Sequence, residues 1–223
     1  MKKLLLLCLP VAISAFGADA NDLKRLNAAA DMFSEIMGTS DKAIPQELLD
    51  KSQCAIVVPG LKKGAFIIGG KYGRGFASCR KPGNVGWSAP AAMRVEGGSI
   101  GFQIGGSETD VIMLVMNESG MKRLLSSKFT LGADASVAAG PVGRTSTAET
   151  DAFMTAEILS WSRARGVFAG VSLQGATMRP DEDVNAALYG AKLQNKDILT
   201  GDRPVPAGAE KLIALLNKYS SRK

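Results

Sequence analysis

The chain has 223 residues, 46% of them hydrophobic, which is enough to bury a substantial core in one domain. It carries 27 Lys and Arg against 21 Asp and Glu, a net charge of +6, and it contains no histidine. Without histidine the chain lacks the usual base of serine hydrolases and the commonest side-chain ligand of metal sites. Composition therefore predicts a basic protein that is not an enzyme, with no catalytic residue, cofactor or metal site.

Residues 1–20 have the pattern of a Sec-type signal peptide. Two lysines precede an apolar run from Leu4 to Phe16, and Ala18-Asp19-Ala20 follows as a cleavage site. The run is shorter than the ~20 residues that a membrane-spanning helix needs. We expect cleavage after Ala20, with Gly17 and Ala18 as alternatives, and a single domain over residues 21–223. The mature protein would be exported, periplasmic or secreted, and peripheral on a membrane.

Apolar residues recur at helical spacing between Leu23 and Met37 and predict an amphipathic helix that packs on the core. A shorter helix is expected from Ile44 to Lys51, with Pro45 in its first turn.

Short β-branched runs from Cys54 to Asn117 are separated by glycine pairs and one proline, a pattern typical of strands joined by tight turns. We expect turns at Pro59-Gly60 and Gly69-Gly70. The expected strands are Ala55–Val58, Ala65–Ile68, Gly75–Cys79, Gly86–Val95, Ser99–Ile104 and Asp110–Met116. The predicted fold is α+β, with a curved, largely antiparallel β-sheet or partly closed barrel and flanking helices.

The second half of the chain alternates between both types of element. The expected elements are a helix at Ser119–Ser127, a strand at Phe129–Ala139, a loop at Arg144–Asp151, strands at Glu157–Arg163 and Val167–Leu173, and helices at Asp181–Tyr189 and Gly208–Tyr219.

The window from Lys51 to Val95 holds eight lysines and arginines and no acidic residue. Cations at this density repel one another unless an anion neutralises them, so the window favours a polyanionic partner. The alternative is ordinary surface pairing with acids elsewhere in the chain, worth about 0–1 kcal/mol a pair. We predict that six of the cations form one contiguous binding patch at one end of the sheet. They are Lys62, Lys63, Lys71, Arg74, Arg80 and Lys81.

Cys54 and Cys79 bracket this basic window. In an oxidising compartment we expect them to form a disulfide; two free thiols, or two ligands of a metal site, are the alternatives.

Two segments resemble enzyme motifs but lack residues or spacing that those motifs require. Gly97-Gly98-Ser99-Ile100-Gly101 matches a nucleophile elbow, but no histidine can activate the serine, and the glycines fit a hairpin turn better. A Ser-Lys dyad is the remaining alternative. The segment from Gly64 to Tyr72 has the wrong spacing for a phosphate loop. Nucleic acid is not expected, because aromatic residues are only 6% and no recognition helix is present.

Two long segments carry a resemblance to a known family. They are Val57-Val-Pro-Gly-Leu-Lys-Lys-Gly-Ala-Phe-Ile-Ile-Gly-Gly-Lys-Tyr-Gly-Arg-Gly75 and Gly101-Phe-Gln-Ile-Gly-Gly-Ser-Glu-Thr-Asp110. Together they resemble the SYLF family of lipid-binding proteins, and the resemblance runs from about Asn21 to Ala209. Members look like secreted single domains in bacteria and like modules beside SH3 or FYVE domains in eukaryotes.

The resemblance implies recognition of anionic phospholipid or phosphoinositide-like headgroups. For an exported bacterial protein, phosphatidylglycerol, cardiolipin or lipid A would be the ligands. It also suggests a membrane-inserting N-terminal helix, but the mixed charge of this helix favours packing. Fungal relatives look like actin-binding proteins; actin is an unlikely partner here because export would separate the two. The alternative function is an envelope interaction protein that docks an acidic protein or polysaccharide. The sequence does not specify the oligomeric state.

Overall fold

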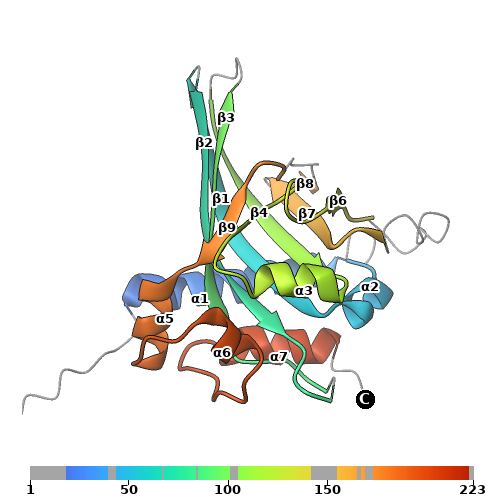
Figure 1. The fold of residues 1–223 in the computed structure, drawn as a ribbon, viewed down its shortest axis with the longest axis vertical. Helices are drawn as coiled ribbons and strands as arrows, with labels where there is room; N and C mark the ends of the chain where they lie inside the picture. The colour runs from blue at the N-terminus through green and yellow to red at the C-terminus, as the bar shows by residue number, and fades with distance from the viewer. Residues whose placement is uncertain are drawn as a thin grey trace, which may run out of the picture.

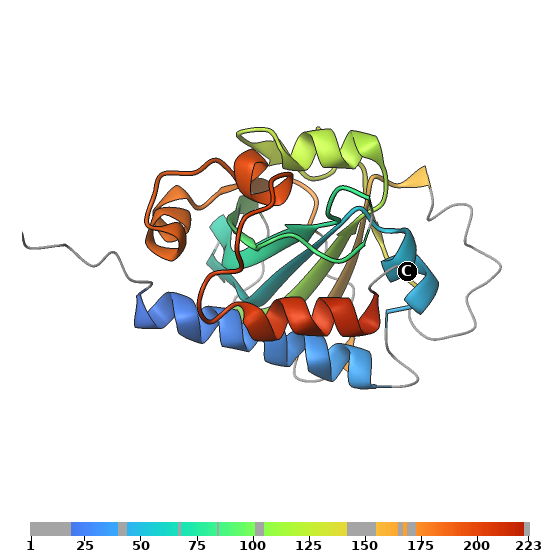
Figure 2. The ribbon, with the colours of Figure 1, turned by 90° about the horizontal axis from the view of Figure 1, so that it is seen from below.

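The computed structural model describes residues 19–39, 44–66, 68–83, 85–100, 105–141, 155–164, 167–168 and 173–220. The expected signal peptide, the loop Arg144–Asp151 and parts of the strands at Ser99–Ile104 and Val167–Leu173 lie outside these residues. The described chain is a strongly curved β-sheet with helices on both faces (Figures 1 and 2). This arrangement confirms the predicted α+β class and curved sheet.

The described strands form one nine-stranded sheet in the order β5-β9-β3-β2-β1-β4-β7-β6, with β8 paired to β7. Every pair is antiparallel except β6 with β7, so the sheet is largely antiparallel as predicted. The strands are β1 (Cys54–Phe66), β2 (Ile68–Cys79), β3 (Ala91–Ile100), β4 (Gly105–Val115), β5 (Phe129–Thr130), β6 (Val137–Ala139), β7 (Ile158–Ala164), β8 (Val167–Phe168) and β9 (Thr177–Pro180).

The helices lie on the two faces of this sheet. Figure 2 shows α1 and α7 side by side on one face and α3 and α6 on the other. The helices are α1 (Ala20–Gly38), α2 (Gln46–Lys51), α3 (Glu118–Leu124), α5 (Glu182–Tyr189), α6 (Asn195–Leu199) and α7 (Glu210–Tyr219). The first of them starts where the side chain of Asp19 accepts a hydrogen bond from the Asn21 N–H, a favoured N-cap arrangement.

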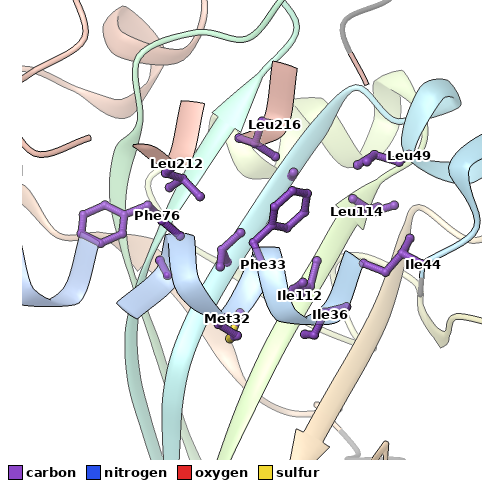
Figure 3. Close-up of a cluster of buried hydrophobic side chains, with 14 of the residues drawn as sticks. Met32, Phe33, Ile36, Ile44, Leu49, Phe76, Ile112, Leu114, Leu212 and Leu216 are labelled. Atoms are coloured by element: carbon purple, nitrogen blue, oxygen red, sulfur yellow. The ribbon is translucent and has the colours of Figure 1, made fainter. Parts of the chain in front are cut away.

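Two hydrophobic cores result, one on each face, because alternate side chains of a strand point to opposite sides. Val57 of β1 joins the core beneath α1 and α7, where Phe33 and Leu212 also pack (Figure 3). Its neighbours Ile56 and Val58 join the core beneath α3 and α6. The sheet is therefore buried on both faces over this part of its length.

The N-terminal helix packs on the core as predicted. Leu26, Phe33 and Ile36 are at most 1% exposed, so the apolar face of α1 is covered by the sheet and α7. Within the described residues, no helix combines the length and apolar character needed to cross a bilayer.

The glycine-rich segments differ from the prediction. Pro59 and Gly60 form no turn; they lie in a β-bulge inside β1, where the pairing register shifts between Val58 and Leu61. Gly69-Gly70, Gly97-Gly98 and Gly105-Gly106 also lie inside strands. Glycine pairs often mark turns, but here each pair is joined by the ladder to the adjacent strand. The expected strand Phe129–Ala139 is likewise two short strands separated by a turn.

Candidate functional site

Four central strands continue beyond both cores. The outermost core residues of β1 and β3 are Leu61 and Val95, and neither core contains a described residue farther out on these strands. We call the outer segments 62–66, 68–72, 96–100 and 105–109 the arm. At about 3.3 Å a residue they extend about 17 Å. Figure 1 shows the arm rising away from α1, α5, α6 and α7.

A row of glycines crosses the arm. Gly64 pairs with Gly70 on one side and with Gly106 on the other, and Gly70 pairs with Gly98. A Cβ built on Gly64, Gly70 or Gly98 would have no atom within 4 Å, so nothing packs on the arm there. Cross-strand partners share a face, so the arm is uncovered at this row on the face toward which these Cβ positions point.

The arm lysines lie on the adjacent rows. Lys63 and Lys71 are direct cross-strand partners, and Lys62 is the partner of Tyr72. Cross-strand partners share a face, so the Lys63 and Lys71 pair projects from one face and Lys62 from the other. Partial burial lowers the pKa of the Lys63 ammonium, and the charge of Lys71 lowers it further. Among the described residues, no carboxylate forms a salt bridge with Lys62 or Lys63.

An exposed aromatic ring stands beside these cations. Tyr72 is 45% exposed, and its hydroxyl accepts a hydrogen bond from Nε of Arg74 at 2.7 Å. Sequence reasoning did not select Tyr72, although its position between Lys71 and Arg74 in a glycine-rich stretch was a usable signal. Exposed tyrosines next to lysines are typical of surfaces that contact a membrane interface.

Arg74 lies at the base of the arm and is already paired. Its Nε is 3.1 Å from Oδ2 of Asp181, a carboxylate that is 1% exposed. Arg94 reaches Oδ1 of the same carboxylate at 2.6 Å, and this bond is the main reason why the pKa of Arg94 is raised. Arg74 therefore helps to neutralise a buried acid, a structural role.

Arg80 and Lys81 lie at the opposite end of β2 from the arm. Nine residues of strand separate Lys71 from Arg80, or about 30 Å. Lys81 pairs with Asp202 at 3.2 Å. The six predicted cations therefore do not form one contiguous patch: Lys63 and Lys71 lie together on one face of the arm, Lys62 lies on its other face, and the other three lie outside the arm. The reason is that β1 and β2 are long uninterrupted strands, so their two ends are far apart.

Arg80 is a buried structural residue, 7% exposed. Its guanidinium donates to the backbone oxygens of Leu49 at 2.9 Å and Ser220 at 2.5 Å, and more weakly to Ser52 at 3.4 Å. It also stacks on Trp87, 3.9 Å from the ring centre. These contacts fix the end of α7 against β2, so the guanidinium has a structural role.

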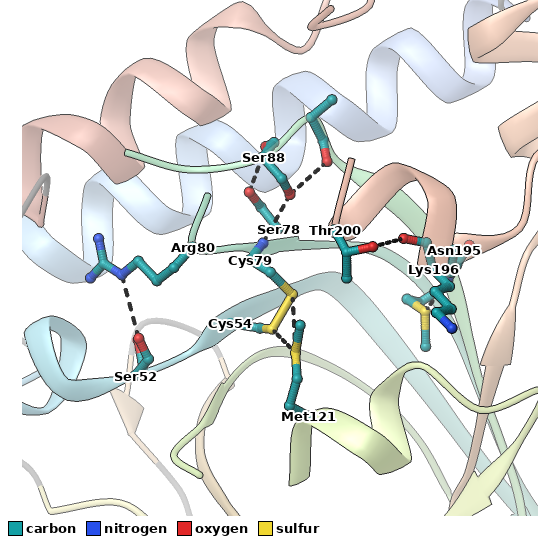
Figure 4. Close-up of a disulfide and its surroundings, with 12 residues drawn as sticks. Ser52, Cys54, Ser78, Cys79, Arg80, Ser88, Met121, Asn195, Lys196 and Thr200 are labelled. Carbon is teal, nitrogen blue, oxygen red and sulfur yellow. Dashed lines mark hydrogen bonds between the residues drawn. A yellow bond between two sulfur atoms is a disulfide. The ribbon is translucent and has the colours of Figure 1, made fainter. Parts of the chain in front are cut away.

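The predicted disulfide is present and also lies at the end opposite the arm. Cys54 and Cys79 are direct cross-strand partners, the first residue of β1 and the last of β2 (Figure 4). Sδ of Met121 in α3 lies 3.0 Å from Sγ of Cys54. The disulfide therefore ties the strands where they enter the core and leaves the arm unconstrained.

Comparison with known proteins identifies the family. Residues 96–219, more than half of the chain, match the family described as "Ysc84: Las17-binding protein actin regulator". The chain belongs to this family. The resemblance to SYLF proteins predicted from the sequence is thereby confirmed.

The relatives are larger proteins. Human "SH3 domain-containing YSC84-like protein 1" is 31% identical over 193 residues, which cover 85% of this chain and 56% of the relative. "Protein YSC84" of Saccharomyces cerevisiae is 32% identical over 180 residues, 79% of this chain and 38% of the relative. The chain spans about half the length, or less, of the curated relatives it matches. The family match begins at Glu96, so the lysine-bearing β1–β2 half of the arm lies outside it.

A groove of about 680 Å³ lies between α1 and the bulge of β1, at the base of the arm. Lys24, Lys62 and Glu108 line it, as do Arg163 and its two partners. Arg163 lies 2.9 Å from Glu35 and 3.0 Å from Asp110, so its charge is already balanced. Charges of both signs line this groove, and one of its acids, Glu108, belongs to the arm as the cross-strand partner of Lys62.

Proposed function

We propose that the chain is a non-enzymatic binding protein that recognises anionic phospholipid headgroups through Lys62, Lys63 and Lys71 of the arm. The observation that carries this proposal is the Lys63 and Lys71 pair: two lysines that are direct cross-strand partners on one face of the arm, with Lys63 in no salt bridge among the described residues. A phosphate between them would relieve their repulsion and restore the pKa of Lys63 toward its ordinary value.

The expected energy is moderate and sensitive to salt. Each lysine near an anionic membrane surface contributes about 1 kcal/mol, so the three arm lysines supply about 3 kcal/mol. Screening shortens the reach of this attraction to ~8 Å at physiological ionic strength. Phosphatidylglycerol, cardiolipin, lipid A and phosphoinositides all carry the phosphate that this chemistry requires.

The proposal includes export of a single domain, residues 21–223, as a peripheral periplasmic or secreted protein. The signal-like sequence of residues 1–20 and the Cys54 and Cys79 disulfide support it, since disulfides persist in oxidising compartments. The family description names an actin regulator. Export would keep this chain from actin, so we place lipid ahead of actin as the ligand.

The second candidate is an envelope interaction protein that docks an acidic protein or polysaccharide. The groove beside Lys62 favours it, because a lining with charges of both signs suits a protein surface.

Cosedimentation with vesicles tests the proposal. Full-length mature protein is mixed with phosphatidylcholine vesicles, with or without phosphatidylglycerol. Lys62→Glu with Lys63→Glu should weaken binding to the anionic vesicles at least tenfold, because each reversal replaces attraction by repulsion, at about 1.4 kcal/mol per factor of ten. The melting temperature should change little, since neither residue belongs to a core.

The matched control is Lys192→Glu with Lys196→Glu, an equal charge change at two exposed lysines outside the arm. Equal loss in both double variants would assign the attraction to net charge instead of the arm. Absence of wild-type binding to every vesicle, together with binding to filamentous actin or an acidic polysaccharide, would contradict the lipid proposal.

A further inference from the structure

One wall of the groove between α1 and the bulge of β1 is a single face of α1. Lys24, Ala28 and Asp31 line it, since residues three or four positions apart lie on the same side of a helix. Ala28 is smaller than the two charged residues beside it, so the wall is lowest at its middle. The groove volume of about 680 Å³ lies within the range of small-molecule sites. The groove is therefore large enough for a small polar ligand.

The bulge of β1 and the start of β4 form the facing wall. Gly60 in the bulge has a φ of +60°, and its N–H donates to Oδ1 of Asp110 at 3.0 Å. A Cβ built on Gly60 would lie 2.4 Å from Oε1 of Glu108. The carboxylate of Glu108 therefore lies directly over the bulge, where glycine leaves room for it. Local backbone geometry thus holds an acid inside the groove.

Several charged groups of the groove are already balanced by a partner. Arg163 has the two carboxylate partners described above. Arg25 lies 2.9 Å from Asp22, and Asp31 pairs with Lys211 of α7. These groups contribute little net charge to a ligand in the groove.

Three charged side chains of the groove remain unpaired. They are Lys24 from α1, Lys62 from β1 and Glu108 from β4, and all three are exposed. None of them forms a salt bridge or a side-chain hydrogen bond with any residue that the structure describes. Two lysines and one glutamate sum to a charge of +1, so a ligand with one negative charge would balance them.

We propose that this groove is a subsite for a phosphodiester that carries hydroxyl groups and a single negative charge, such as the headgroup of phosphatidylglycerol. The phosphate accepts hydrogen bonds from the ammonium groups of Lys24 and Lys62, and a ligand hydroxyl donates to the carboxylate of Glu108. The inference rests on the proposed lipid binding by Lys62 and adds to it the class of headgroup. Lys24 reaches the phosphate with its long side chain, so α1 itself needs no contact with the bilayer.

Glu108 makes this subsite selective. Its charge repels a second anionic group on the ligand, whether a further phosphate or the carboxylate of phosphatidylserine. A phosphodiester that bears an ammonium group has no net charge and would leave one positive charge of the groove unbalanced. A neutral hydroxyl donor satisfies Glu108 without either cost.

Two lipids that differ only in their hydroxyl groups test the subsite. Phosphatidylglycerol and phosphatidylmethanol both carry one negative charge, but only the first has headgroup hydroxyls. Each is mixed at the same fraction into phosphatidylcholine vesicles and titrated with full-length mature protein. We expect about tenfold tighter binding to phosphatidylglycerol, the effect of one hydrogen bond to a charged acceptor. Equal affinity for the two would overturn the subsite and leave the proposed lipid binding intact; absence of binding to both would overturn the two proposals together.

The ratio of the two affinities isolates the role of Glu108. Glu108→Ala should bind both lipids alike, whereas loss of an acid through net charge alone would raise both affinities and keep their ratio. Glu108→Gln keeps an oxygen acceptor without the charge and should retain about a threefold preference. The matched control is Asp197→Ala, because Asp197 is an exposed acid of α6 on the other face of the sheet (Figure 2), and it should keep the tenfold ratio. An unchanged ratio in Glu108→Ala would contradict the proposal.

Lys24→Ala should weaken binding to phosphatidylglycerol about fivefold, because one of the two phosphate contacts is lost. Lys196→Ala removes an exposed lysine of α6 as its control and should change the affinity less than about twofold. Equal losses in the two variants would overturn the assignment of Lys24.

Soluble glycerophosphoglycerol distinguishes a lipid from a free phosphodiester as the source of the ligand. Calorimetric binding of this compound by protein that does not bind the vesicles would support the groove chemistry and overturn lipid binding. An acidic protein is the other possible occupant of the groove, and poly-glutamate represents it. Displacement of vesicles by poly-glutamate, with no displacement by glycerophosphoglycerol, would overturn the subsite.

Discussion

The same strands have two different environments along their length. Near Ile56 and Val57 both faces of the sheet are covered by helices, and these side chains are at most 1% exposed. Beyond Leu61 the strands carry lysines and a row of glycines, and no described residue of the outer β1 belongs to a core. The comparison teaches that strand pairing alone can extend a sheet past its cores. The glycine row of the extension is uncovered at Gly64, Gly70 and Gly98, whereas Ala176 still approaches Gly97 at its base.

Glycines show the same contrast at the level of single atoms. A Cβ on Gly75, in the covered part of β2, would lie 2.2 Å from the backbone oxygen of Val57, whereas a Cβ on Gly64 in the arm would meet nothing. Gly75, in the covered part, lets β2 approach the backbone of β1 at the bulge. Gly64, in the arm, leaves one face of the strand without a side chain.

The largest expected effect comes from Arg80, at the end opposite the arm. Arg80→Met should lower the free energy of unfolding by about 4 kcal/mol, because buried carbonyl oxygens of Leu49 and Ser220 lose a charged donor. Urea denaturation measures it. Lys81→Met is the control and should cost less than about 1 kcal/mol, since its partner Asp202 is largely exposed. Equal losses of unfolding free energy in the two variants would contradict the structural role of Arg80. Weaker vesicle binding by Arg80→Met protein that is still folded, with normal binding by Lys81→Met, would contradict the division between body and arm.

Removal of the disulfide should have the next largest effect. Cys54→Ala with Cys79→Ala should lower the free energy of unfolding by about 3.5 kcal/mol, the chain-entropy value for a sequence separation of 25 residues. Affinity for anionic vesicles should stay the same, because the disulfide lies at the far end of β1 and β2. A reductant should lower wild-type stability by the same amount. Alkylation of both thiols in the native exported protein would show that the disulfide is absent.

The smallest effect compares two glycines on adjacent strands. Gly75→Ala should destabilise the protein by about 2 kcal/mol because the new methyl overlaps the Val57 oxygen. Gly64→Ala should be neutral or stabilise by about 0.5 kcal/mol, since alanine restricts the unfolded chain and meets no neighbour here. Thermal melting of both variants checks the difference. A destabilised Gly64→Ala protein would mean that the arm is packed after all.

Local sequence pattern was sufficient for part of this fold. Helical spacing from Leu23 to Met37 predicted α1 and its buried face, and the two cysteines flanking the basic window predicted their pairing. The glycine pairs led to wrong strand boundaries, because a glycine pair in the sequence is compatible both with a turn and with a position inside a paired strand. Only the register, in which Gly64, Gly70, Gly98 and Gly106 align, shows that the strands continue.

Only part of the predicted cation cluster lies in the arm, for a similar reason. Lys62, Lys63 and Lys71 are close in sequence, so their charge pattern selected one strand segment and its neighbour. Arg80 has the same charge, but its burial depends on Ser220, 140 residues away, and on the stacking of Trp87. Contacts of that separation leave no local trace in the sequence.

The most direct test of the account is amide hydrogen exchange with and without anionic vesicles. The central claim is that the arm, and not the helices, contacts the membrane. Exchange should slow in residues 62–72 and 96–109 on addition of phosphatidylglycerol vesicles, and stay unchanged in α1 and α7, whose apolar faces are already buried. Slower amide exchange in α1, with unchanged exchange in the arm, would contradict the account.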